Sequence, residues 1–206
     1  MKNLNYNSKK EKVIKFAAEI ATFDGWTDKT LFAAAKKLDI SPKEAKLLFP
    51  RVGIDLARFY HQYQDRVFFK EFLQVDISNL SHFEKVELAI KMRFQAMAKN
   101  KEVLRKGMAI FVMPMHQIEG INLLWSTCDT IWFNIKDKSD GFTWYSKRVT
   151  LVSVYLSALL FFLGDQSIQS RETELFITRR LEDVKKFGML KVDIGEFISR
   201  VISNTQ

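Results

Sequence analysis

The chain has 206 residues, which is enough for one well-packed core, and we expect one domain with at most a small subdomain. Only three prolines and eight glycines occur, so a turn-rich all-β chain is excluded and an all-α fold is favoured. The formal net charge of +8 predicts an anionic partner, either nucleic acid or a phospholipid surface.

Three short helices are predicted in the first fifty residues. Residues 8–23 form the first, with Ser8 as its cap, and its apolar face consists of Val13, Phe16, Ala17, Ile20 and Phe23. Thr27 caps the second helix, and Ser41-Pro42, a cap followed by a first-turn proline, begins the third. Three short helices with a tight turn between the last two indicate a helix-turn-helix unit.

Longer helices are predicted after this unit. The first covers residues 54–75. The second begins after Ser81, which caps it, and the other two cover residues 101–113 before Pro114 and residues 121–135 after Gly120. Aromatic side chains dominate the apolar side of the first of these helices. Such helices fit a larger body that follows the helix-turn-helix unit.

The most apolar segment of the chain lies within Cys128–Leu163. Residues 149–163 carry no charge, but these 15 residues fall short of the roughly 20 that a membrane-spanning helix needs. Thr150, Ser153 and Ser157 recur at helical spacing, which suits close helix contacts better than a lipid-facing surface. We therefore predict a buried core helix.

Two aromatic and two basic residues precede this apolar segment: Trp144, Tyr145, Lys147 and Arg148. Adjacent helix positions point about 100° apart, so at most one of the two aromatic rings is central on the buried face, and a partly exposed pair suits an interface. Arg148 either holds an anionic head group at a cavity mouth or pairs with Asp129, Asp137 or Asp140. The spacing leaves both readings open.

Near the C-terminus, residues 172–188 form an amphipathic pattern. One arc of the helical wheel contains Phe176, Ile177, Arg180, Leu181, Val184 and Phe187, with Arg180 as the only charge inside it. Flanking cations are typical of helices that lie in a membrane interface, but a helix packed on the core or on a dimer mate gives the same pattern. Residues 197–202 predict a short further helix.

Enzyme signatures are largely missing. The single Cys128 allows no intramolecular disulfide, and three scattered histidines give no zinc spacing. His116 and Glu119 form one weak pair where a di-iron site needs several inward ligands, and Asp129 is expected to be a helix-surface hydrogen bonder. We expect a protein that is not an enzyme and that has no cofactor or metal.

The helix-turn-helix unit raises a DNA-binding regulator as the alternative. Its recognition helix would cover residues 42–49 and present Lys43, Glu44 and Lys46. Lysines contact phosphate, whereas base readers such as Arg, Asn and Gln are absent from this helix. We do not expect specific DNA binding, and a TetR-family regulator with a hydrophobic effector pocket stays the alternative function.

One stretch resembles a known family. The sequence DTIWFNIKDKSDGFTWYSKRVTLVSVYLSALLFF is similar to the signature region of the Coq-nine family of lipid-binding accessory proteins of ubiquinone biosynthesis, where an Asp-x-x-Trp helix leads into a Trp-Tyr-x-(Lys/Arg)-Arg helix. The early Asp-Gly-Trp-Thr and the Leu-Phe-Pro after the third helix agree with this family. The resemblance covers about residues 10–188.

The resemblance implies an all-α, TetR-like helical bundle that forms a two-fold homodimer. Residues 1–52 would be a helix-turn-helix-like head, residues 53–170 a ligand-binding body, and residues 171–206 an amphipathic helix and tail. The implied protein is not an enzyme: it holds an isoprenoid quinone or phospholipid in a hydrophobic cavity. It would present quinone intermediates to the membrane-associated demethoxyubiquinone hydroxylase of the Coq-seven type.

The resemblance also implies roles for individual residues. Arg148, with Trp144 and Tyr155, would bind lipid. The hydroxylase would contact Trp144, Tyr145, Ile131 and Trp132. The phospholipid membrane surface would be bound by Phe176, Ile177, Arg180, Leu181, Val184 and Phe187.

The N-terminal residues bear on location. They are basic but lack the apolar run of a secretion signal, so we expect a reducing interior compartment. The expected place is the bacterial cytoplasm, peripheral on the inner membrane, or the matrix side of the mitochondrial membrane for a processed eukaryotic form.

Overall fold

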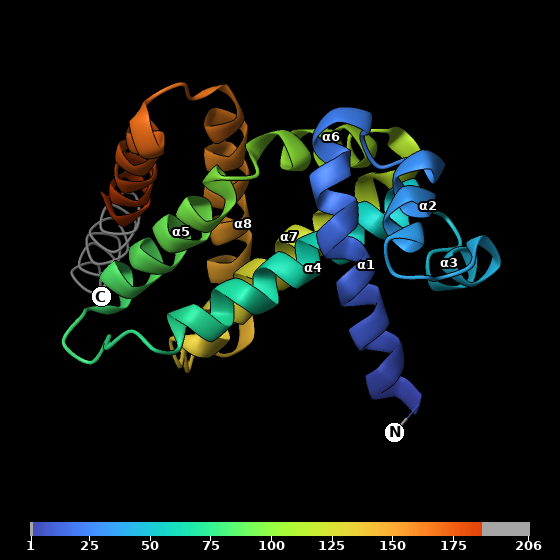
Figure 1. Ribbon diagram of the computed structural model, residues 1–206. Helices are drawn as coiled ribbons and strands as arrows, with labels where there is room; N and C mark the ends of the chain where they lie inside the picture. The colour runs from blue at the N-terminus through green and yellow to red at the C-terminus, as the bar shows by residue number, and fades with distance from the viewer. Residues whose placement is uncertain (1, 187–206) are drawn as a thin grey trace, which may run out of the picture.

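A computed structural model of the chain describes residues 2–186, and this part is helical with no strand. The helices are α1 (Lys2–Asp24), α2 (Asp28–Lys36), α3 (Pro42–Leu48), α4 (Gly53–Phe72), α5 (His82–Ala98), α6 (Lys101–Phe111), α7 (Gln117–Asn134) and α8 (Gly141–Gly164), with short 3₁₀ turns η1 (Pro114–His116) and η2 (Ile168–Ser170). Residues 171–186 form a further helical segment. In Figure 1, α1–α3 lie at one end, and α5, α8 and this segment lie at the other.

Capping side chains fix where three of the helices begin, as the sequence predicts. The Thr30 amide donates to Thr27 Oγ1, and the Glu44 amide donates to Ser41 Oγ at 3.2 Å. At α5, the Glu84 amide donates to Ser81 Oγ while the Ser81 amide donates to the Glu84 carboxylate at 2.8 Å. This reciprocal pair is a capping box, which satisfies two amides that have no partner within the helix.

Two predicted helix starts are wrong. The first helix begins at Lys2 rather than at Ser8, and its predicted face is also incorrect at Phe23, which is 84% exposed. The helix after η1 begins at Gln117 and includes Gly120. A Cβ at Gly120 would lie 2.9 Å from the Cβ of Phe111, so this glycine allows α6 and α7 to approach closely instead of separating two elements.

The buried side chains form two clusters, one at each end of α4. The head cluster combines α1–α3 with Leu56, Ala57 and Tyr60 of α4 and with Val103 of α6. The body cluster combines the other end of α4, where Phe68 lies, with α5, α7, α8 and residues 171–186. Because α4 contributes buried side chains to both clusters, it connects the head to the body.

The apolar segment forms the long helix α8. Its buried apolar face consists of Leu151, Val154, Tyr155, Ala158, Leu159 and Phe162, which confirms the predicted core helix. The length argument was wrong, however, because the helix has 24 residues and is the one described helix long and apolar enough to span a membrane. Buried core helices can pass the same test, and one face of α8 packs against α5 and α7 in the body cluster.

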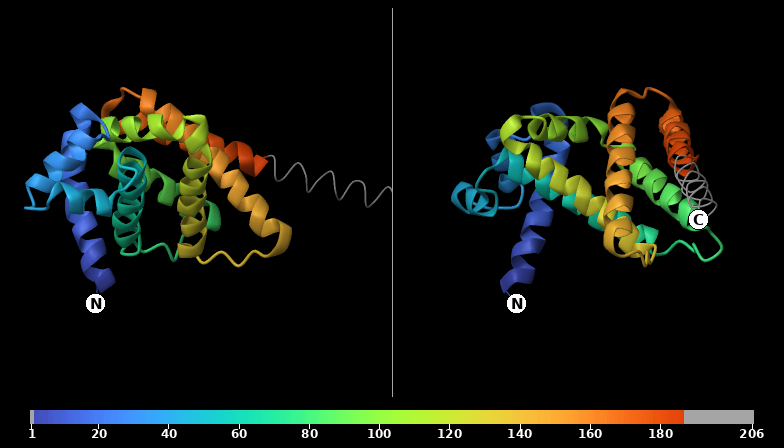
Figure 2. Two further views of the ribbon diagram at one scale, coloured as in Figure 1. Left: turned by 90° about the vertical axis from the view of Figure 1, so that its right-hand side faces the viewer. Right: turned by 180° about the vertical axis from the view of Figure 1, so that it is seen from behind.

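The helical segment 171–186 packs beside α5 and α8 (Figure 2). Asp165 caps its start, because its carboxylate accepts from the Thr173 amide at 2.9 Å and from the Thr173 hydroxyl at 2.6 Å. Burial would raise the pKa of Asp165, but hydrogen bonds from Ser167 and Thr173 lower it to about 2. The Phe176 ring stacks on Phe161 with ring centroids 4.5 Å apart.

This packing corrects the predicted membrane-binding face. Ile177 and Leu181 are buried in the body cluster, and Phe176 and Val184 pack against it. Arg180 is exposed and pairs with Asp183 at 2.9 Å. The apolar arc therefore faces the protein core, which the sequence pattern had left as one of its readings; Phe187 and the helix predicted over residues 197–202 lie outside the described residues.

Candidate functional site

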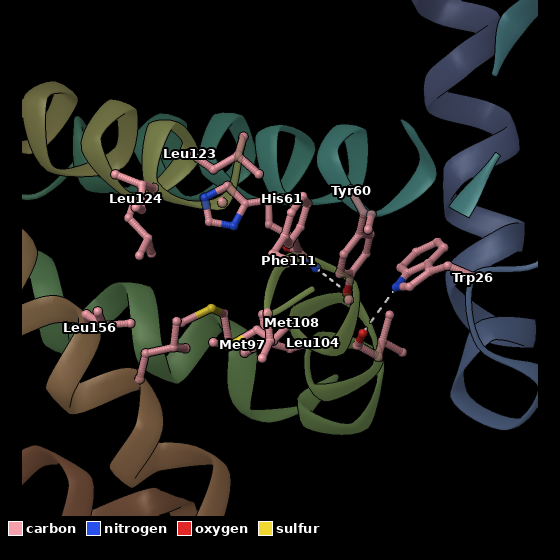
Figure 3. A pocket seen from close by; sticks show the side chains of 18 of the residues that line it. Trp26, Tyr60, His61, Met97, Leu104, Met108, Phe111, Leu123, Leu124 and Leu156 are labelled. Atoms are coloured by element: carbon pink, nitrogen blue, oxygen red, sulfur yellow. Dashed lines mark hydrogen bonds between the residues drawn. The ribbon is translucent and has the colours of Figure 1, made fainter. Parts of the chain in front are cut away.

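A cavity of about 280 Å³ lies where the head meets the body (Figure 3). Its walls come from the loop before α2, from the helices α4–α8 and from the α6–α7 connection. The lining residues are Trp26, Ala57, Tyr60, His61, Gln64, Arg93, Met97, Asn100, Val103, Leu104, Gly107, Met108, Phe111, Val112, Gln117, Gly120, Ile121, Leu123, Leu124, Leu156 and Leu159. Most of them are apolar, so the cavity suits a hydrophobic ligand.

Trp26 closes the end of the cavity that lies toward the head. It is 5% exposed, its indole N–H donates to the Val103 carbonyl at 3.3 Å, and its ring centroid lies 5.2 Å from that of Tyr60. Figure 3 shows Leu156 of α8 at the opposite end, beyond Leu124 and Met97. The head helices and α8 thus face the same internal space from two sides.

The cavity reaches the surface beside the α6–α7 connection. Val112 and Ile121 line it and are 65% and 58% exposed. The neighbouring side chains of Met113, Met115 and Ile118 are exposed as well. We call these five residues the mouth patch, and they surround the opening with apolar surface.

Polar groups gather on one wall, where α4 and α5 face each other. His61 and Gln64 come from α4, Arg93 comes from α5, and all three line the cavity. Figure 3 shows the His61 and Tyr60 side chains pointing from α4 into this space. The Gln64 amide donates to the Tyr60 hydroxyl at 2.6 Å. The cavity therefore combines a long apolar surface with a local polar wall.

A buried ion pair supports this wall. Arg93 is 1% exposed, and its Nε donates to Asp65 Oδ1 at 2.9 Å. The Thr127 hydroxyl donates to Asp65 Oδ2 at 2.7 Å, and His61 Nε2 lies 2.9 Å from the Thr127 oxygen. These four residues, which we call the polar cluster, connect α4, α5 and α7.

The charges of the ion pair are stabilised by each other. Burial would raise the pKa of Asp65, but nearby His61 and Arg93, with hydrogen bonds from His61 and Thr127, lower it to about 2. Burial also works against the charged form of Arg93, yet Tyr155 and Asp65 raise its pKa above the ordinary value. Asp65 is therefore an anion and Arg93 a cation at neutral pH.

The three residues predicted to bind lipid do not line this cavity. Trp144 is half-buried and Tyr155 is fully buried in the body cluster, where its ring lies 5.1 Å from that of Phe94. Arg148 is 5% exposed and is held within the protein: its Nε donates to Asp129 at 2.5 Å, and its Nη1 donates to the Trp144 carbonyl at 3.2 Å. The sequence alternative of an Arg148–Asp129 pair is thus confirmed, and the prediction that Arg148 opens into the cavity is wrong.

The predicted partner-binding residues differ in their exposure to solvent. Ile131 is fully buried in the body cluster, which corrects its prediction as a contact residue, and Trp132 is only partly accessible. Tyr145 is 60% exposed beside half-buried Trp144, as the angle between adjacent helix positions predicts. Phe133, Phe142 and Val149, which the sequence analysis did not select, are exposed too; with Tyr145 they form what we call the entrance patch.

Other candidate residues have internal partners. Cys128 is fully buried, and burial raises the pKa of its thiol. Glu119 accepts from Arg51 at 2.8 Å. On the exposed side of α3, Glu44 pairs with Lys9 at 2.7 Å and Lys46 pairs with Asp28. In residues 2–186, no group of three or more His, Cys, Asp or Glu side chains is arranged to hold a metal ion.

The polar wall of the cavity is not predicted from the sequence, although the sequence contains one signal for it. Arg93 lies three residues after Ile90 and four before Met97, so a charge stands on the apolar stripe of α5. Such a charge needs an internal partner. The partner itself, Asp65, comes from another helix, and nothing in the local pattern identifies it.

Comparisons with known proteins agree with this architecture. Residues 118–188 match the family model COQ9. The chain is 26% identical to the "Probable ubiquinone biosynthesis protein coq9, mitochondrial" of Dictyostelium discoideum, over 92% of the chain and 64% of that protein. It is 24% identical to the "Ubiquinone biosynthesis protein COQ9, mitochondrial" of Homo sapiens, over 86% of the chain and 58% of that protein. The chain thus spans less than two thirds of the length of these two relatives.

A solved structure gives the fold. The TetR transcriptional regulator from Nitrosomonas europaea superposes with a TM-score of 0.69 at 22% identity, over 85% of this chain and 97% of that one. This likeness confirms the predicted TetR-like, all-α fold, with its helix-turn-helix head. The sequence matches add that the chain is similar to the COQ9 proteins of ubiquinone biosynthesis.

Proposed function

We propose that the protein is a non-enzymatic accessory protein of ubiquinone biosynthesis that holds an amphipathic lipid, an isoprenoid quinone intermediate or a phospholipid, in its cavity. The observation that carries this proposal is the cavity itself, which is apolar over most of its surface, polar on one wall and open beside an apolar mouth patch. Such a site matches a molecule with a long hydrocarbon part and a small polar part.

Lipid extraction tests the proposal directly. Mass spectrometry of the organic extract from purified protein should reveal an isoprenoid quinone or a phospholipid. The variant Leu124→Trp, which adds bulk to the cavity wall, should carry less than half as much lipid. Leu47→Trp adds the same bulk at a residue that is 67% exposed on α3 and should carry the wild-type amount. An empty wild-type extract, or equal loading of both variants, would refute lipid binding in the cavity.

We further propose that the entrance patch binds a demethoxyubiquinone hydroxylase of the Coq-seven type. Exposed aromatic side chains at this density are typical of interaction surfaces. Lys147 lies nearby and pairs at 2.7 Å with Asp137, whose side chain is buried. Trp144 supports the patch from below, because its ring lies 3.7 Å from the Arg148 guanidinium carbon and 4.7 Å from the Tyr145 ring.

The second apolar face of α8 supports a homodimer. At about 100° per residue, Val149, Leu156 and Leu160 fall on one side of α8, away from the buried face. A helix that is apolar on two opposite sides packs against a partner on each side.

We propose that a second copy of the chain covers Leu156 and Leu160, while the hydroxylase covers the entrance patch. Leu160→Glu should convert dimers to monomers in light scattering, and Leu73→Glu, a change at an exposed residue directly after α4, should not.

The mouth patch supports work at a membrane surface. It is apolar and exposed, and it adjoins the opening through which a lipid would pass. The net charge of +8 favours anionic headgroups. We therefore propose peripheral binding through this patch, on a bacterial inner membrane or on the matrix side of the mitochondrial membrane. Ile118→Glu should reduce co-flotation with anionic liposomes; unchanged flotation would contradict this site.

A TetR-type regulator is the second candidate, and the fold of the head favours it. Of the two lysines on the exposed side of α3, Lys46 is held in an ion pair with Asp28 of α2, which weakens its availability to phosphate. Glu44, on the same side, is an anion and would repel phosphate. Sequence-selective binding to DNA that resists added salt would support the regulator, because nonspecific binding by a cationic protein fades steeply with salt.

A further inference from the structure

The polar cluster contains a donor that its internal partners leave unused. The Arg93 guanidinium gives its Nε hydrogen to Asp65, but Arg93 Nη1 is buried and has no hydrogen-bond partner within residues 2–186. The side chain is 1% exposed and belongs to the cavity wall. An unpaired buried donor is costly, so a group that accepts a hydrogen bond in the cavity would be bound favourably here.

The hydrogen bonds within the polar cluster determine which nitrogen of His61 carries a hydrogen. Thr127 has one hydroxyl hydrogen, and the charged Asp65 carboxylate at 2.7 Å is a nearer and stronger acceptor for it than the Leu123 carbonyl at 3.1 Å. His61 Nε2, at 2.9 Å from the same hydroxyl oxygen, must then be the donor in that contact. In the neutral ring this leaves Nδ1 of His61 as an acceptor. With a neutral His61 ring, the wall thus presents one donor from Arg93 and one acceptor from His61.

The charge balance decides which headgroup fits. Asp65 lies 2.9 Å from Arg93 Nε and already neutralises its charge. A carboxylate or phosphate bound at Arg93 would be a second buried anion beside Asp65, sharing one cation in a medium of low polarity. A carbonyl or hydroxyl oxygen accepts the free hydrogen without adding charge.

Resting on the proposed lipid cavity, we propose that the polar cluster is a headgroup site that selects an uncharged, oxygen-bearing ring, a quinone or phenol, over an anionic lipid headgroup. Arg93 donates to a ring oxygen, and Asp65 sets the selectivity by balancing the charge of Arg93. The tail of the ligand lies along the apolar wall formed by Met97, Leu124 and Leu156.

Three probes separate the possibilities. Decylubiquinone carries an uncharged oxygenated ring, decanoic acid carries an anionic headgroup, and decylbenzene has neither. Each is titrated into the full-length, delipidated protein against Nile red bound in the cavity. Wild type should bind decylubiquinone about tenfold or more tightly than the other two probes, as expected for one hydrogen bond to a charged group.

Arg93→Lys keeps the positive charge beside Asp65 but removes the guanidinium fork. It should lose most of the preference for decylubiquinone and retain the affinity for decylbenzene. Arg66→Lys, on the outer face of α4 where Arg66 pairs with Glu11, is the matched control and should behave like wild type. Circular dichroism and thermal midpoints check that each variant is folded.

Asp65→Asn gives an independent readout, because it leaves Arg93 without its counter-charge. The affinity for decanoate should rise about tenfold relative to decylubiquinone. Unchanged quinone preference in Arg93→Lys, or tighter binding of decanoate than of decylubiquinone by wild type, would overturn the headgroup site while leaving lipid binding intact. Failure of all three probes to displace Nile red would overturn the cavity proposal itself.

Discussion

Two buried arginines, Arg93 and Arg148, stand in the body of this protein and differ in what surrounds them. Arg148 contacts Asp129, the Trp144 carbonyl and the Trp144 ring, and Asp137 lies 3.9 Å away. Arg93 has one carboxylate partner, and its Nη1 has none among the described residues. A saturated guanidinium holds helices together, whereas an unsaturated one on a cavity wall is available to a ligand.

The largest effect on the free energy of unfolding is expected from replacing Arg93. Arg93→Met leaves Asp65 buried without its cation and should lower the free energy of unfolding by about 3–5 kcal/mol. Arg148→Met should cost less, about 1–2 kcal/mol, because Asp129 is 44% exposed and water can solvate it. Urea denaturation of both variants measures the difference. Equal losses in the free energy of unfolding would show that the two arginines contribute equally to stability.

At low pH, protonation of Asp65, the partner of Arg93, should lower the stability of the protein. The pKa of Asp65 is about 2 in the folded protein and about 3.9 in an unfolded chain, so folding lowers it. The resulting stabilisation is present above pH 4 and is lost as the pH falls through 2, and it amounts to about 2 kcal/mol. Wild type should therefore lose about that much more stability than Asp65→Asn between pH 5 and pH 2. Asp165 titrates in the same range in both proteins and cancels from the difference; parallel curves would contradict the assignment.

The partner of Arg148 should matter less. Asp129→Asn keeps a hydrogen-bond acceptor for Arg148 and removes a half-exposed charge, so the free energy of unfolding should fall by about 1 kcal/mol or less. Asp140→Asn is the control, because Asp140 is exposed and makes no side-chain cap bond at the start of α8. A loss above about 3 kcal/mol for Asp129→Asn would mean that Arg148 depends on this single partner as Arg93 depends on Asp65.

The sequence predicted the architecture well because helices carry local signals. The caps at Thr27, Ser41 and Ser81, the apolar stripe of α5 and the core role of α8 are all confirmed. These features depend on residues within a few positions of one another. Where the pattern was ambiguous, as for residues 171–186, only the packing of Ile177 and Leu181 against α5 and α8 decided the face.

The candidate site was predicted less well, because it depends on contacts between distant residues. The polar cluster joins Asp65, Arg93 and Thr127, which span 62 positions of the chain. A local sequence pattern cannot predict contacts between residues so far apart. Motif resemblance directed attention to Arg148, which turned out to be saturated by Asp129. The two arginines differ in burial and in hydrogen-bond partners, which depend on the three-dimensional packing and not on local sequence.

The smallest effect on stability is expected at Tyr145, on the surface above Arg148. Its ring is 60% exposed, so Tyr145→Ala should change the free energy of unfolding by less than about 0.5 kcal/mol. If the entrance patch binds the hydroxylase, the same change should weaken the complex about tenfold in a titration by calorimetry, because exposed aromatic residues are common hot spots. Leu73→Ala, a truncation at an equally exposed position after α4, should leave the affinity unchanged. A complex that is insensitive to Tyr145→Ala would place the hydroxylase elsewhere and leave Arg148 with a structural role alone.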